Sequence, residues 1–337
     1  MRPTMADARM MPMIQTLGAF RAALVTGWIA LSAAGFLYAR ERNIPMWAAV
    51  PIVAAFLLEY SFYLVPGFET IRLRLRTRFT PAQLAFLTAG SGVLPYLVYS
   101  IATGQFRWLS FVALAGITAI LCFWYVMLKA SPLLDLLFLA FVAAMVLLRV
   151  FDDIYSSPVR VRIDILGKLM LVHCGALVML ELRRVHRVRF GFLPSQKEWI
   201  TGVRYFFYFL PVGLPLVIGL GLGHLAYPTI PFWQTLAIFF GILWVVALGE
   251  EFFFRGLLQN WLAEWTGNRY LALAAVSLLF GAAHLWFRGF PNWKLAIVAA
   301  VAGCFYGLAY HKAASIRASM VAHALVVALW RTVFVFV

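Results

Sequence analysis

The chain has 337 residues, of which 64% are hydrophobic and only 12% are charged. Soluble domains carry about 25% charged residues, so this composition excludes an ordinary water-soluble fold. Lys and Arg number 28 against 13 Asp and Glu, a net charge of +15. Because the arginines gather in short stretches between apolar runs, we interpret the excess as loops held against anionic membrane lipid, and we expect no nucleic-acid partner.

Apolar runs long enough to cross a bilayer recur along the whole sequence. A helix of roughly 18 to 23 apolar residues spans the hydrocarbon core, and helices keep their backbone hydrogen bonds satisfied there. We therefore predict an all-α fold, a polytopic transmembrane helical bundle of about eleven spans. The predicted spans cover residues 17–38, 46–66, 82–103, 108–128, 132–150, 163–182, 200–222, 232–251 with a possible extension to 265, 270–287, 293–310 and 315–336.

Basic loops predict how the spans are oriented. Four arginines follow each of the second and sixth spans, whereas Arg40, Arg42, Arg160 and Arg162 lie on the other side. The two groups are Arg72, Arg74, Arg76 and Arg78, and Arg183, Arg184, Arg187 and Arg189. Cytoplasmic loops are enriched in such residues, so we predict that both loops and the N-terminus are cytoplasmic. The protein is then an integral multi-pass membrane protein, in the plasma (inner) membrane if it is bacterial.

A basic, proline-containing stretch over residues 183–197 divides the chain. We take it as a domain boundary, with a multi-span region of unknown role over residues 1–197 and a second region over residues 198–337.

Ionisable residues inside apolar helices are costly and therefore mark candidate functional sites. In the first region Glu59, Asp135 and His173 stand apart from one another in the sequence. We interpret each as a structural hydrogen bond to a neighbouring helix.

In the second region ionisable residues cluster on successive apolar helices. Glu251 and Arg255 are four residues apart, so they share a helix face and can neutralise each other. Glu250 points about 100° away and is left without such a partner. A carboxylate in a semi-dry cavity binds protons more readily than in water, which makes Glu250 a candidate general base.

Two histidines follow, each at the end of a short motif, Phe280-Gly-Ala-Ala-His284 and Ser319-Met-Val-Ala-His323. Together with Glu250 they could position a water and stabilise an oxyanion on a peptide carbonyl. The alternative is a buried polar network that only holds helices together.

The order E-E-x-x-x-R, F-x-x-x-H and a last His-bearing helix resembles the CPBP family of CAAX proteases and bacteriocin-processing proteins, over about residues 232–331. The resemblance implies a glutamate-dependent intramembrane endopeptidase. Its catalytic residues would be Glu250, Glu251, His284 and His323, supported by Arg255, Ser319 and Phe280.

A cofactor is not expected. Zinc could be held by Glu250, His284 and His323, but H-E-x-x-H is absent and the Arg255 guanidinium disfavours a nearby dication. One position departs from the family pattern, because Val327 stands where an Asn or Asp usually follows the last histidine. Ser319, one turn before His323, is the candidate replacement partner for the ring.

Three functions remain open from the sequence. The first is a peptidase that acts on a membrane-associated peptide or protein, with membrane lipid as the other partner. The second is a non-catalytic scaffold or immunity-type protein that keeps the polar cluster. The third is a proton-coupled transporter, for which the sequence offers no repeated halves.

Overall fold

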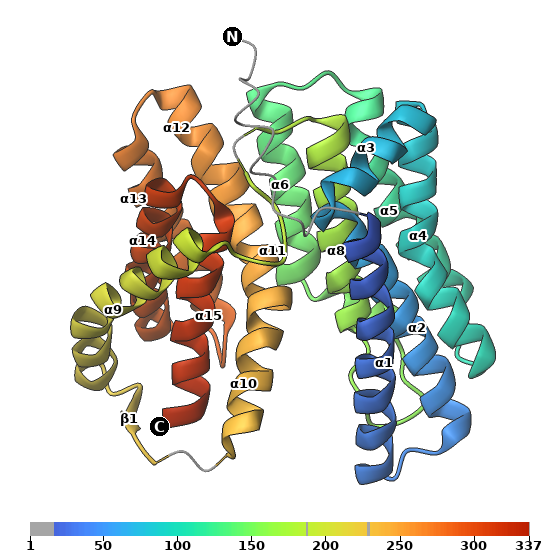
Figure 1. The fold of residues 1–337 in the computed structure, drawn as a ribbon, viewed down its shortest axis with the longest axis horizontal. Coiled ribbons are helices and arrows are strands. Elements are labelled where there is room, and N and C mark those ends of the chain that lie inside the picture. Colours follow the sequence, from blue (N-terminus) through green and yellow to red (C-terminus); the bar gives the residue numbers. More distant parts are fainter. Residues whose placement is uncertain (1–16, 187, 228–229, 337) are drawn as a thin grey trace. The chain divides into compact units, whose positions relative to one another are not determined.

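The structure is a computed structural model that describes residues 17–186, 188–227 and 230–336 (Figure 1). Arg187, one of the arginines used for the orientation, lies outside the described residues. The chain forms two compact units, residues 1–184 and 185–337. The functional boundary after residue 197 stays a prediction.

Helices dominate the described chain and sheet is almost absent from it, which confirms the all-α polytopic class. Unit 1 contains α1 (Leu17–Glu41), α2 (Met46–Leu64), η3 (Val65–Gly67), α3 (Glu69–Arg78), α4 (Pro81–Ala102), α5 (Trp108–Met127), α6 (Pro132–Leu147), α7 (Val150–Ile154), α8 (Ile165–Leu177) and η4 (Val178–Leu182). Unit 2 contains α9 (Gln196–Gly219), β1 (Gly223–Leu225), α10 (Phe232–Gly241), η5 (Ile242–Ala247), α11 (Leu248–Glu251), η6 (Phe252–Gln259), α12 (Asn260–Thr266), α13 (Arg269–Ala283), η7 (His284–Trp286), α14 (Trp293–Ala313), α15 (Ile316–Val333) and β2 (Phe334–Phe336). The two short strands pair antiparallel.

Ten helices of the described residues are long and apolar enough to cross a membrane. The remaining predicted span, residues 132–150, contains the shorter helix α6 of 16 residues, about 24 Å in length. It ends early because Arg149 adopts a left-handed backbone conformation with φ 55°, after which α7 begins.

The two basic segments of unit 1 lie on the same side of the bundle. Arg72 and Arg76 of α3 both bind the buried Glu181 carboxylate at the end of η4, at 2.8 and 2.7 Å. Arg183, which follows η4, binds Asp135 of α6 at 2.7 Å. These contacts agree with the prediction that the loops after residues 66 and 182 share one side of the membrane.

The three ionisable residues of unit 1 that stand apart in the sequence each have a polar partner on another segment, in agreement with the predicted hydrogen bonds. Asp135 binds Arg183, whereas His173 Nδ1 lies 2.6 Å from Glu59 Oε1. Glu59 and His173 are 114 positions apart, which is why the sequence did not suggest that they pair.

In unit 2 one continuous helical segment of 35 residues runs over Phe232–Thr266. It includes two π-helical stretches, η5 and η6, on either side of the four residues of α11. A π-helix bonds residue i to i+5, which widens the turn and often occurs at functional sites. Glu250 and Glu251 therefore lie about halfway along the segment, between the two widened stretches.

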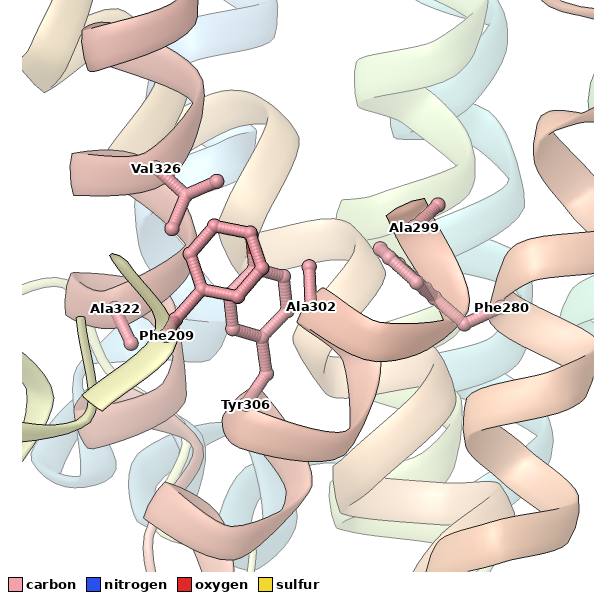
Figure 2. Close-up of a cluster of buried hydrophobic side chains, with 7 residues drawn as sticks. All are labelled: Phe209, Phe280, Ala299, Ala302, Tyr306, Ala322 and Val326. Carbon is pink, nitrogen blue, oxygen red and sulfur yellow. The ribbon is translucent and has the colours of Figure 1, made fainter. Parts of the chain in front are cut away.

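The core of unit 2 beside this segment comes from four helices. Figure 2 shows a buried cluster in which alanines of α14 and α15 lie among the larger rings of α9, α13 and α14. The cluster consists of Phe209, Phe280, Ala299, Ala302, Tyr306, Ala322 and Val326. The small side chains allow close helix approach. The rings of Phe280 and Tyr306 therefore pack closely between these helices, next to the polar residues of the candidate active site.

Candidate active site

A buried ion pair forms the base of the polar cluster. Arg255 Nη1 lies 3.0 Å from Glu251 Oε1, and both side chains are fully buried. The prediction that these residues, one helical turn apart, neutralise each other agrees with this contact. Glu251 Oε2 and Arg255 Nε have no hydrogen-bond partner in the described part of the chain.

Three further groups fix the Arg255 side chain. Its Nη2 donates to the backbone carbonyl of Gly303 at 2.9 Å. The guanidinium also lies over the Phe280 ring, 4.5 Å from the centroid, and 5.5 Å from the Tyr306 centroid. Gly303 has to be small here, because a Cβ on it would come within 3.1 Å of both Arg255 Nη2 and Phe280.

His323 contacts the same Glu251 oxygen as Arg255 does. Its Nδ1 is 2.8 Å from Glu251 Oε1, and its side chain is only 4% exposed. The Tyr306 ring stacks on the imidazole with 4.7 Å between centroids and an interplanar angle of 9°, and Phe280 meets it edge-on at 5.8 Å. The ring is therefore held in one orientation from three sides.

Glu250 is the accessible member of the cluster. Its side chain is 37% exposed, and its Oε2 lies 3.9 Å from His323 Nε2. The two adjacent glutamates thus reach the two nitrogens of one imidazole, Glu251 by a direct hydrogen bond and Glu250 across a wider gap. The sequence predicted that Glu250 points away from Arg255, but it did not suggest that both glutamates face His323.

His284 lies at the end of α13 and is half-buried. Its Nδ1 is 2.8 Å from the Phe280 carbonyl, and its ring packs against the Phe280 ring at 4.8 Å. Phe280 in turn touches His323, so one aromatic ring separates the two histidines. In the described residues no hydrogen bond or ion pair joins His284 to Glu250.

His323 has a polar partner although Val327 stands one turn after it. Its Nδ1 lies 2.8 Å from Glu251 Oε1. The Ser319 hydroxyl, proposed as the replacement partner for the ring, instead donates to the Ile316 carbonyl at 2.8 Å. The partner of the imidazole is therefore Glu251 and not Ser319.

Sequence reasoning did not assign roles to Tyr306 and Gly303, although both lie in the glycine-containing helix that carries part of the family resemblance. Their spacing of three residues places them on one helix face, which is the signal that could have found them. Tyr306 orients His323 and Gly303 admits Arg255.

A zinc site requires three protein ligands around one point. Within the described ranges no group of three His, Cys, Asp or Glu side chains is arranged to hold a metal ion. Each histidine has its Nδ1 turned to a protein oxygen, a contact that metal-binding histidines also make through the nitrogen that does not bind the metal. That the site needs no metal stays a prediction.

Comparison with known proteins bears on the C-terminal unit. Residues 231–329 match the family described as "Type II CAAX prenyl endopeptidase Rce1-like". This match is consistent with a CPBP family member over the C-terminal part of the chain. The predicted resemblance over residues 232–331 is thus confirmed, and with it a CAAX-protease-like intramembrane peptidase at the level of the family. No curated protein and no solved structure matches the chain.

Proposed function

We propose that unit 2 is an intramembrane endopeptidase in which Glu250 activates a water that attacks a peptide bond of a membrane-associated substrate. The observation that carries the proposal is the 3.9 Å separation between Glu250 Oε2 and His323 Nε2, with Glu251 and Arg255 behind the imidazole. Glu250 is also the one exposed residue of the four, so it is the group that a substrate can reach.

The tautomer of His323 follows from its contacts. Glu251 Oε1 accepts a hydrogen bond, so Nδ1 carries the proton and the neutral ring presents the Nε2 lone pair toward Glu250. Two acceptors 3.9 Å apart cannot bond each other but can share a donor. A water about 2.8 Å from both would lie about 2 Å off the line that joins them and could donate one proton to each.

This arrangement turns the lone pairs of the water away from the protein and toward an incoming carbonyl. In the proposed step the water oxygen attacks the carbonyl carbon while Glu250 takes its proton. The carbon–nitrogen bond then breaks, and the proton passes from Glu250 to the leaving amine. Glu251 stabilises the imidazole, and Arg255 balances the Glu251 charge.

His284 has a narrower role than the sequence suggested. Because its Nδ1 donates to the Phe280 carbonyl, the neutral ring has no proton on Nε2. It can stabilise an oxyanion only as an imidazolium. We therefore propose that Glu250 and His323 handle the water and that His284 lines the site beside Phe280.

The substrate is a peptide or protein in or on the membrane, and membrane lipid is the other partner. The family name suggests a prenylated C-terminus as a first substrate to test. We keep the orientation predicted from the arginines, with the N-terminus in the cytoplasm and, in a bacterium, a plasma (inner) membrane location.

The test is cleavage of lipid-anchored peptides by the full chain in nanodiscs, with a prenylated and an unprenylated peptide of the same sequence. Glu250→Gln should lower the rate at least a hundredfold. Glu264→Gln is the matched control, because Glu264 is an exposed glutamate on the same helical segment. Equal cleavage by Glu250→Gln and wild type would refute the role of Glu250 as the base, whereas no cleavage of either peptide by the wild-type chain would favour a scaffold.

A further inference from the structure

A second constellation of polar side chains lies in unit 1 and has no part in the site above. Ser91 of α4 lies with its Oγ 3.1 Å from His173 Nε2 on α8, and His173 Nδ1 lies 2.6 Å from Glu59 Oε1 on α2. The three residues come from three membrane helices that pack together in this unit (Figure 1). We propose that Ser91 is a nucleophile, activated by His173 and Glu59, that takes an acyl group from a lipid ester.

The geometry follows the logic of a serine, histidine and acid triad. The acid accepts the Nδ1–H of the imidazole, which leaves Nε2 as a base directed at the hydroxyl. Both separations are within hydrogen-bond range, as required for a nucleophile and its base. Recognition of such a site rests on these roles and not on sequence order.

The three side chains differ in burial in the way that such a site requires. Glu59 and His173 are fully buried, whereas Ser91 is partly exposed. Glu59 Oε2 has no hydrogen-bond partner in the described residues, so no donor weakens the charge that would stabilise an imidazolium. The acid and base are therefore enclosed, and the nucleophile is the member that a ligand can reach.

The surroundings of Ser91 indicate the class of substrate. The preceding Gly90 is exposed, and a Cβ on it would meet no atom within 4 Å. Leu87 and Leu94, one turn before and after Ser91, are 46% and 41% exposed. Because this helix crosses the membrane, exposed leucines there contact acyl chains, and a substrate that reaches Ser91 arrives from the lipid phase.

Two other groups compete for the same atoms. The Ser91 hydroxyl also lies 2.7 Å from the Thr88 carbonyl, and Cys174 Sγ lies 3.2 Å from His173 Nε2. A rotation of the hydroxyl moves its proton from the carbonyl to the imidazole. Cys174 is fully buried, so Ser91 is the accessible nucleophile of the pair.

The proposed step balances without a further reactant. Ser91 Oγ forms a bond to the ester carbonyl carbon, and the bond from that carbon to the alcohol oxygen breaks. The serine proton passes to His173 Nε2 and then to the departing alkoxide, which leaves as a free alcohol. The enzyme keeps the acyl group as a serine ester.

The test uses an alkyl fluorophosphonate probe. An activated serine attacks the phosphorus atom of this probe, and fluoride leaves. The full chain in nanodiscs is treated with the probe, and the adduct is located by peptide mass spectrometry. We expect an adduct on Ser91 of the wild-type chain, none in Ser91→Ala, and a rate about a hundredfold lower in His173→Gln. Ser61→Ala should label at the wild-type rate, because the Ser61 hydroxyl donates to the Leu57 carbonyl of its own helix.

Mapping on the wild-type chain keeps the test decisive even if a buried variant misfolds. A wild-type chain without an adduct on Ser91 overturns the proposal, as does labelling that is as fast in a folded His173→Gln variant. Either result would leave the three residues as a purely structural network.

Discussion

The Glu251 to Arg255 pair gives the sharpest prediction about stability. Both side chains are fully buried and 3.0 Å apart, and Arg255 also binds the Gly303 carbonyl. Arg255→Met keeps a long flexible side chain but leaves the Glu251 carboxylate buried without a cation. Removing one partner of such a pair lowers the free energy of unfolding by about 3–5 kcal/mol. The equilibrium constant for unfolding should therefore rise by roughly two to three and a half powers of ten.

Adding Glu251→Gln to Arg255→Met should restore part of this loss, because no buried charge is left uncompensated. The double variant should therefore be more stable than the sum of the two single losses predicts, with a coupling of about 1–3 kcal/mol. Equilibrium unfolding in SDS, followed by circular dichroism, measures all four proteins. Strictly additive losses, or a loss below about 1 kcal/mol for Arg255→Met, would refute the view that Arg255 compensates the buried Glu251 charge.

Three further predictions concern the surroundings of the site. Val327→Asn should change kcat less than about threefold, since Glu251 already serves His323 Nδ1; a large gain in cleavage would show that the ring lacks its partner in this chain. Gly281→Ala places a Cβ 2.5 Å from the Ala296 carbonyl and should lower the free energy of unfolding by about 1–3 kcal/mol. In the control Gly116→Ala the new Cβ has no atom within 4 Å, so the free energy of unfolding should change by less than about 0.5 kcal/mol. Thermal unfolding measures both, and equal shifts would contradict the packing. Removal of divalent metal with a chelator should leave cleavage within about twofold, and a loss that zinc reverses would disprove a metal-free mechanism.

The sequence was informative wherever a local rule decided the structure. Apolar run length predicted the membrane helices, and it failed only at residues 132–150, where the backbone of Arg149 ends α6 early. Helical periodicity predicted that Glu251 and Arg255 meet, since one turn separates them. The family motifs marked about residues 232–331, which closely agrees with the matched residues 231–329.

Contacts between distant helices were beyond such rules. His323 and Glu251 are 72 positions apart, and no pattern in either helix states which ring nitrogen faces which carboxylate. For the same reason Ser319 was the plausible partner for His323 until packing placed Glu251 there. The π-helical stretches around α11 also depend on tertiary packing, because helix propensity alone favours an unbroken α-helix.

The central claim is that Glu250 and His323 act on one water, and the kinetics of a double variant test it most directly. Residues that act as a unit are strongly non-additive when they are removed together. Glu250→Gln, His323→Ala and the double variant should be compared by kcat/KM on the same anchored peptide, with thermal unfolding as the check on folding. The account predicts that the double variant is no slower than the slower single variant. Losses that multiply would contradict it, because two groups that act independently do not share a water.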